Sequence, residues 1–95
     1  MYTNRFAYTH STGSVLVSSG KTLFHSFILN DVLTTGTLTI YDNTSAAGNV
    51  IAGPMNVPSG SAPIPRLYDA YCNTGLYFNF SGFAGDATIM WTLIA

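Results

Sequence analysis

Hydrophobic and polar residues alternate with a period of two along most of the chain, the spacing at which successive side chains of a β-strand point to opposite faces. The alternation is clearest over residues 37–42, where Leu38 and Ile40 point one way and Tyr41 points the other way with the threonines. Comparable runs occupy six further segments: 14–18, 22–30, 49–52, 66–72, 76–81 and 87–94. The pattern therefore predicts a chain of short strands.

Two of these runs are apolar on both faces. In the run 22–30, alternation places Leu23, His25, Phe27 and Leu29 on one face and Phe24, Ser26 and Ile28 on the other. The run 87–94 likewise has no plainly polar face. Because only one face of a strand meets the core, we expect the second face to meet a neighbouring segment or subunit.

Glycine and proline set the spacing of the predicted strands. The nine glycines leave no gap wide enough for a long helix. Turns at intervals of roughly 8–12 residues indicate an all-β fold, an antiparallel β-sandwich or jelly roll of about seven or eight short strands. All four prolines lie within residues 53–65, which we predict to be an extended crossover between strand groups that has room for one edge segment around Met55 to Val57. We expect one domain over residues 14–95, preceded by an N-terminal arm or edge strand over residues 1–13.

The composition changes this picture by pointing to assembly. Only 7% of the 95 residues are charged, against about 25% in an ordinary soluble domain. Glu and Gln are absent from the sequence, and the net charge is −1. A surface poor in charge and rich in apolar groups favours association with other molecules. The alternative is a neutral, threonine-rich domain that stays soluble on its own.

Several classes of function are excluded by the same counts. Arg5, Lys21 and Arg66 are the only basic side chains besides histidine, too few for a nucleic-acid footprint. The longest strongly apolar stretch, residues 88–95, is too short to span a bilayer, so no membrane partner is expected. Cys72 is the single cysteine, which excludes an intrachain disulfide and favours folding in the cytosol.

No set of residues predicts catalysis, a metal site or a cofactor. His10 and His25 are the only imidazoles, and the sequence places no nucleophile or carboxylate beside either of them. Three of the four aspartates fall at predicted turns, whereas Asp69 lies within the run 66–72. We expect Asp69 to contact Arg66, either along that strand or across a subunit boundary. The chain is therefore not expected to be an enzyme.

An aromatic platform for sugar is the alternative binding chemistry. Tyr68, Tyr71, Tyr77 and Phe83 are candidates for stacking, and Asn73 and Asn79 for hydrogen bonds to hydroxyl groups. Aromatic anchors are used more commonly at protein interfaces, which we weigh as the leading interpretation of these residues.

Three stretches of sequence carry a resemblance. They are VLVSSGKTL at residues 15–23, GTLTIYDNTSAAG at residues 36–48, and NTGLYFNFSG at residues 73–82 before a final apolar strand. Together they resemble small β-sandwich proteins of tailed bacteriophages, over most of the chain beyond residue 13. Proteins of this group serve as capsid decoration (cement) proteins, and related ones occur in head fibres and tail components.

The resemblance implies a structural virion protein. The expectation is a capsid decoration subunit, a homotrimer bound to the major capsid protein on the capsid surface and assembled in the host cytoplasm. The alternative is a head-fibre, tail or baseplate module that binds a host receptor or carbohydrate. We predict capsid contacts at Tyr2, Arg5, Phe6, Tyr8 and Met55, and subunit contacts at His25, Arg66, Tyr68, Asp69 and Tyr71.

Overall fold

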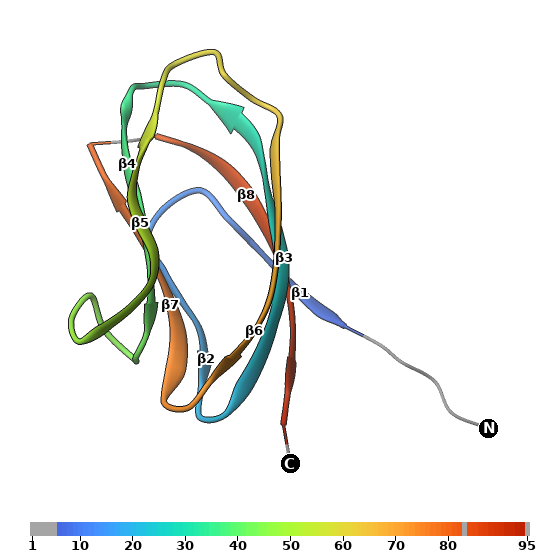
Figure 1. Cartoon of the computed structure of the whole chain (residues 1–95). Coiled ribbons are helices and arrows are strands. Elements are labelled where there is room, and N and C mark those ends of the chain that lie inside the picture. Colours follow the sequence, from blue (N-terminus) through green and yellow to red (C-terminus); the bar gives the residue numbers. More distant parts are fainter. Residues whose placement is uncertain (1–5, 83, 95) are drawn as a thin grey trace.

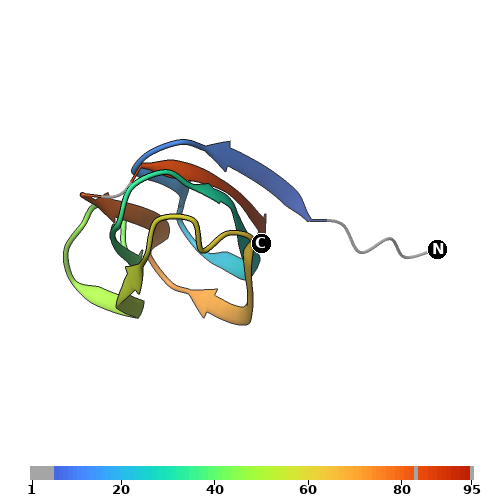
Figure 2. The ribbon, with the colours of Figure 1, turned by 90° about the horizontal axis from the view of Figure 1, so that it is seen from above.

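The computed structural model of the chain describes residues 6–82 and 84–94. They form eight strands: β1 (Ala7–Ser11), β2 (Val15–Ser19), β3 (Thr22–Val32), β4 (Gly36–Asp42), β5 (Asn49–Val57), β6 (Ile64–Cys72), β7 (Gly75–Ser81) and β8 (Gly85–Leu93). Two four-stranded antiparallel sheets pack face to face, sheet A in the order β1-β8-β3-β6 and sheet B in the order β2-β7-β4-β5 (Figures 1 and 2). The predicted all-β sandwich is confirmed.

The strands pair from the two ends of the chain inward. β1 pairs with β8, β2 with β7, β3 with β6 and β4 with β5, and successive pairs alternate between the two sheets. This nested pairing is the strand order of a jelly roll. It brings β1 and β8, which are far apart in the sequence, side by side.

The core lies between the inner faces of the two sheets. Its centre is a cluster of aromatic rings from Phe24, Phe27, Tyr68 and Phe78, with ring centroids 5.2–6.5 Å apart. The folded chain exposes 5183 Å², close to the roughly 5,300 Å² expected for a compact monomer of this mass. The sandwich therefore closes within one chain, and no second copy is needed to complete its core.

Strand β3 departs from the simple alternation that the sequence predicted. Phe24 and Phe27 are both buried although they are three residues apart. The register against β8 shifts between Phe24 and Ser26, so His25 is an extra residue in β3. Such a bulge reverses the facing of the side chains that follow it, until a second shift between Leu29 and Asp31 restores the original facing. The prediction that His25, Phe27 and Leu23 share a face is therefore wrong.

The proline-rich segment is also shorter than predicted. Strand β5 continues through Gly53 and Pro54 to Val57, so the connection to β6 is confined to residues 58–63 and not to 53–65. Proline is tolerated here because β5 is an edge strand, where one side of the backbone needs no donor. A register shift against β4 accommodates the extra residue near Gly53.

The N-terminal segment contributes the edge strand β1 to sheet A. Residues 7–11 pair with β8, and Trp91 Nε1 donates a hydrogen bond to Thr9 Oγ1 at 2.9 Å. Residues 1–5, which include the predicted contacts Tyr2 and Arg5, lie outside the described residues. At least the second half of the segment is therefore part of the sandwich.

Asp42, at the end of β4, holds the turn between β6 and β7. Its carboxylate accepts hydrogen bonds from the backbone N–H groups of Asn73, Thr74 and Gly75 at 2.9–3.3 Å. Burial raises the pKa of Asp42, but the three backbone donors outweigh burial and hold the pKa below 3.8. One carboxylate thus ties sheet B to the turn that crosses between the sheets.

We expect Asp42→Asn to lower the free energy of unfolding at pH 7 by about 2 kcal/mol, because an amide N–H₂ would replace an oxygen that accepts a charge-assisted bond. Asp42 has a lowered pKa in the folded state. Its contribution is therefore full above its unfolded pKa and is lost as the pH falls through its folded pKa. Urea titrations from pH 7 to pH 2 should show the two proteins converging in acid. A constant difference at every pH would contradict this assignment.

Candidate functional site

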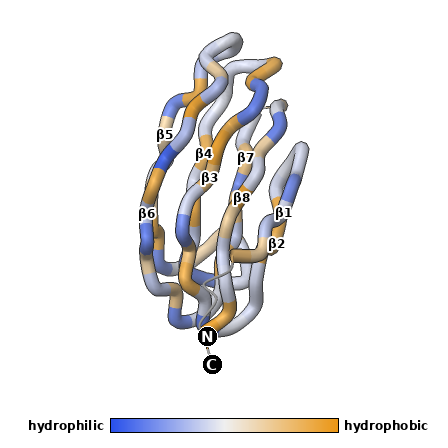
Figure 3. The backbone as a smooth tube through the Cα atoms, turned by 90° about the vertical axis from the view of Figure 1, so that its right-hand side faces the viewer, coloured by the Kyte–Doolittle hydropathy of each residue, from blue (hydrophilic) through white to orange (hydrophobic). Residues whose placement is uncertain are grey.

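A row of exposed side chains crosses the outer face of sheet A. Tyr8 on β1 lies opposite Met90 on β8, Met90 opposite Ser26 on β3, and Ser26 opposite Leu67 on β6. Tyr8 is 72% exposed, Leu67 68% and Met90 39%. Figure 3 shows this sheet toward the viewer, with β6, β3, β8 and β1 side by side. Three of the four strands thus present a large apolar side chain in one line.

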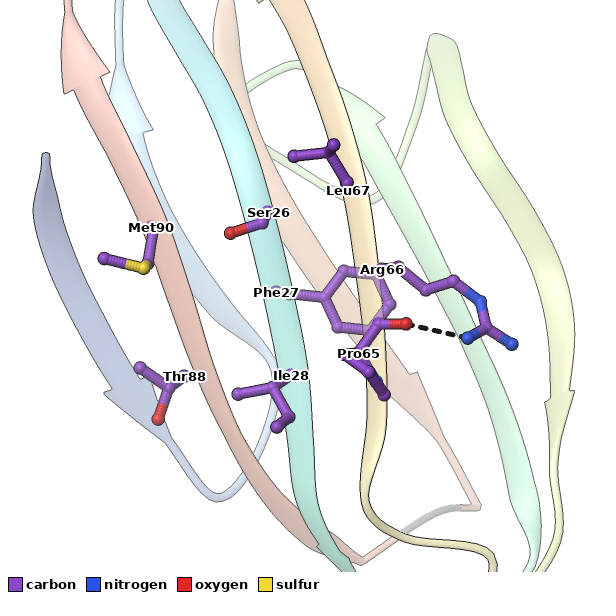
Figure 4. A pocket seen from close by; sticks show the side chains of 8 residues that line it. All are labelled: Ser26, Phe27, Ile28, Pro65, Arg66, Leu67, Thr88 and Met90. Atoms are coloured by element: carbon purple, nitrogen blue, oxygen red, sulfur yellow. Dashed lines mark hydrogen bonds between the residues drawn. The ribbon is translucent and has the colours of Figure 1, made fainter.

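A shallow groove runs along this row at the centre of the sheet. It has a volume of about 370 Å³. Ser26 is short and lies between Met90 and Leu67, while Ile28, Pro65 and Thr88 line the adjacent part (Figure 4). The groove is mainly apolar, because Ser26 and Thr88 contribute only hydroxyl groups and the Arg66 guanidinium is directed away from it (Figure 4). It is a contact surface for apolar groups.

One border of the groove is a polar cluster. Asp86 Oδ1 accepts a hydrogen bond from Asn30 Nδ2 at 3.0 Å and lies 2.6 Å from His10 Nε2, and Asn30 Nδ2 also donates to Thr88 Oγ1. The hydrogen bond from Asn30 holds the pKa of Asp86 below 3.8 despite partial desolvation. The hydrogen bond with His10 and the electrostatic attraction to its ring act in the same direction. Asp86 therefore stays ionised at neutral pH. The sequence placed Asp86 at a turn and did not predict this cluster.

A second His–Asp pair lies farther along β3. His25 Nδ1 is 2.5 Å from Asp69 Oδ1, and the Phe6 ring stacks on the His25 ring at 4.3 Å between centroids. Asp69 has φ of +49°, the left-handed conformation that Asp tolerates better than most residues. The expected contact of Asp69 with Arg66 along the strand is wrong: the partner of Asp69 within the chain is His25.

The other residues predicted at interfaces are divided between core, edge and surface. Tyr68 is half-buried, and its ring stacks on that of Phe24. Met55 is half-buried and packs against the core. Arg66 turns across the edge of β6, where its Nη1 donates to the carbonyl of Pro65 at 2.7 Å. Tyr71 is 73% exposed.

Among the described residues, the side chains predicted to form a sugar platform do not come together. Tyr68 points into the core and Tyr71 away from it, and Tyr77 belongs to the other sheet. Phe83 lies outside the described residues. Asn73 is in the turn held by Asp42, and Asn79 is on β7. These candidate residues, although close in the sequence, are therefore divided between the core, the exposed surface of sheet A, and sheet B with its turn.

The outer face of sheet B carries its own apolar row. Leu16 on β2 lies opposite Tyr77 on β7, Tyr77 opposite Tyr41 on β4, and Tyr41 opposite Val50 on β5. Leu16 and Val50 are 44% and 49% exposed. Both outer faces of the sandwich therefore present apolar side chains. The two runs predicted to be apolar on both sides, 22–30 and 87–94, belong to β3 and β8 of sheet A.

The sheet edges are protected against pairing with another strand. The edge strands β1 and β2 have five residues each. The edge strands β5 and β6 contain Pro54 and Pro65. The Pro65 carbonyl accepts a hydrogen bond from the Arg66 side chain, so it points away from β3. In an antiparallel strand the N–H and C=O of one residue point to the same side, so the position at which proline lacks an N–H is also on the free edge. Short strands and edge prolines are the devices by which β-proteins prevent edge-to-edge association.

Neither a metal nor a membrane site is found in the described parts of the chain. Within residues 6–82 and 84–94, no three His, Cys, Asp or Glu side chains come together in a way that would hold a metal ion. Over the same residues, no helix has the length and apolar character needed to cross a bilayer.

Comparisons with models of known protein families, with curated proteins and with solved structures gave no match to this chain.

Proposed function

We propose that the chain is a structural virion protein, a capsid decoration or cement subunit that binds and stabilises a phage head. The observation that carries the proposal is the contrast between faces and edges: both outer faces bear exposed apolar rows, whereas all four edge strands are short or interrupted by proline. Such a module associates through its faces and does not polymerise through its strands.

The virion setting comes from the resemblance of residues 15–23, 36–48 and 73–82 to phage β-sandwich proteins. The physical properties of the chain agree with that setting. A subunit with adhesive surfaces on opposite sides can contact a capsid on one side and another subunit on the other side. The low charge of −1 limits repulsion between crowded copies. The partners proposed are the major capsid protein and further copies of the chain.

Immunogold electron microscopy of purified virions from the virus that encodes the chain tests this function. We expect label over the capsid surface. Label confined to the tail or fibres would favour the alternative module, and purified virions without label would overturn both. Because residues 7–9 belong to β1, a deletion aimed at the predicted N-terminal contacts should remove only residues 1–5 and leave the sandwich intact. This deletion is expected to weaken capsid binding at least tenfold in a sedimentation assay.

The alternative, a fibre, tail or baseplate module that binds carbohydrate, is favoured by one observation. The cluster of His10, Asn30 and Asp86 borders an apolar groove, and sugars present both hydroxyl groups and apolar ring faces. Glycan-array binding that is lost in Asp86→Ala and retained in Tyr77→Ala, whose position is on the other sheet, would support this function.

A further inference from the structure

We propose that the outer face of sheet A binds the same face of a second copy of the chain, sheet against sheet, around a two-fold axis. The inference rests on the proposed function in one respect, that the chain works by self-assembly. It goes further by assigning the self-contact to one face and by naming the residues that meet.

The protected edges are the first step. A second copy that joined the sheet through β6 would have to pair with a backbone interrupted by Pro65 and covered by Arg66. At the opposite edge of sheet A it would meet the five-residue strand β1. Self-association is therefore directed to the flat faces.

The second step is the order of side chains across the face. A two-fold axis parallel to the strands, midway between β8 and β3, exchanges β1 with β6 and β8 with β3. In the row Tyr8, Met90, Ser26 and Leu67, this operation places Tyr8 over Leu67 of the second copy and Met90 over Ser26 of the second copy. Met90 is long and flexible and Ser26 is the short residue in the groove, so each copy supplies both a projection and a recess.

Most charged side chains of this face already have partners within the same copy. The His10–Asp86 pair and the His25–Asp69 pair lie on this face, and in each pair the aspartate contacts a histidine within the same copy. Burying groups that already have partners avoids the cost of an isolated charge. Asp31, which is exposed and lies opposite Asp86, is a further acid at that end of the face. Among the residues that line the groove Arg66 is the charged one, and its guanidinium is directed away from the groove (Figure 4).

The area is sufficient for a reversible dimer. Four strands spaced about 4.8 Å apart, and about nine residues long at about 3.3 Å per residue, cover about 600 Å². Two such faces would bury about 1,200 Å² in total, at the lower end for specific interfaces. We therefore expect a dimer that dissociates on dilution in the micromolar range and not a permanent one.

The test is sedimentation equilibrium across a dilution series, with one variant on each sheet. Leu67→Asp and Val50→Asp introduce the same charge at positions 68% and 49% exposed, and neither lies in the buried core. The wild type should shift between 10.2 kDa and twice that mass. Leu67→Asp should raise the dimer dissociation constant at least tenfold, and Val50→Asp should leave it within twofold. Circular dichroism confirms that both variants are folded.

A second measurement tests the pairing itself. Met90→Cys protein mixed with Ser26→Cys protein should form a mixed disulfide in preference to either homodimer, because only the mixed pair brings the two positions together. The native thiol of Cys72 is 1% exposed and does not compete. Homodimers of Met90→Cys alone would overturn the proposed axis.

Other outcomes separate this inference from the proposed function. A dimer abolished by Val50→Asp alone would place the self-contact on sheet B and overturn the inference. A stable mass of three times 10.2 kDa would overturn the two-fold contact while agreeing with the trimer that the resemblance implies. A monomer at every concentration would overturn self-association, and immunogold labelling would then decide the virion function independently.

Discussion

Replacing Phe24 with alanine should lower the free energy of unfolding by about 3–5 kcal/mol, much of the stability of a small domain. Phe24 is fully buried. Its ring centroid lies 5.2 Å from that of Tyr68, 5.6 Å from that of Phe78 and 6.5 Å from that of Phe27. Removing the ring therefore leaves a cavity where the two sheets meet, and three other rings lose a neighbour at once.

The native thiol of Cys72 offers a second readout of this variant. Burial, with a smaller effect of the Asp42 charge, raises the pKa of Cys72 to about 11, and the side chain is 1% exposed. The thiol should therefore react with a labelling reagent only when the protein opens. Urea titration and the labelling rate should both report the loss in Phe24→Ala. Leu16→Ala, at a 44% exposed position, is the control and should cost less than 1 kcal/mol. Equal effects of the two changes would contradict the assignment of the core.

Gly75→Ala should be nearly as damaging, at about 3 kcal/mol, although it adds a single methyl group. A Cβ atom at Gly75 would lie 2.8 Å from the backbone oxygen of Ser18 and 2.8 Å from that of Asn43. Both obstacles are backbone, which cannot rotate away as a side chain can. The same residue donates its N–H to Asp42, so a shift that relieves the clash also disturbs that bond.

Gly13→Ala is the matched control, because nothing lies within 4 Å of the position that its Cβ would take. We expect its melting temperature to stay within about 2 °C of the wild type, and that of Gly75→Ala to fall by more than 10 °C. Similar melting temperatures for the two variants would mean that the chain around Gly75 yields more easily than its packing indicates.

The class of fold could be predicted from the sequence because each strand carries a local pattern. Residues 37–42 alternate between core and surface, and glycine or asparagine marks the turn that follows most strands. The bulge at His25 has no such local pattern, since it depends on how β3 aligns with β8 and β6. Pro54 and Gly53 suggested the end of a strand, and only the edge position of β5 explains why the strand continues.

The candidate site was less predictable than the fold for the same reason. Exposed aromatics such as Tyr8 and Tyr71 could be proposed as contacts from composition alone, but Tyr68 has the same chemistry and lies in the core. The row that joins Tyr8 to Leu67 exists only once four strands from distant parts of the sequence are in register. The partnership of His25 with Asp69, which are 44 residues apart, likewise requires the sheet.

The nested order of strand pairs has a consequence for how the protein is made. β4 and β5 are joined by a short loop, so their hairpin can form while the chain is still emerging from the ribosome. Of these eight strands β1 is synthesised first, yet its partner β8 is the last of them to appear. β2 and β3 can pair with β7 and β6 before β8 appears, whereas β1 must wait for β8 without a strand partner, and closure of such a long loop is slow. The nascent chain thus depends on its final strand, and we expect ribosome-bound chains truncated before residue 85 to be digested readily by protease.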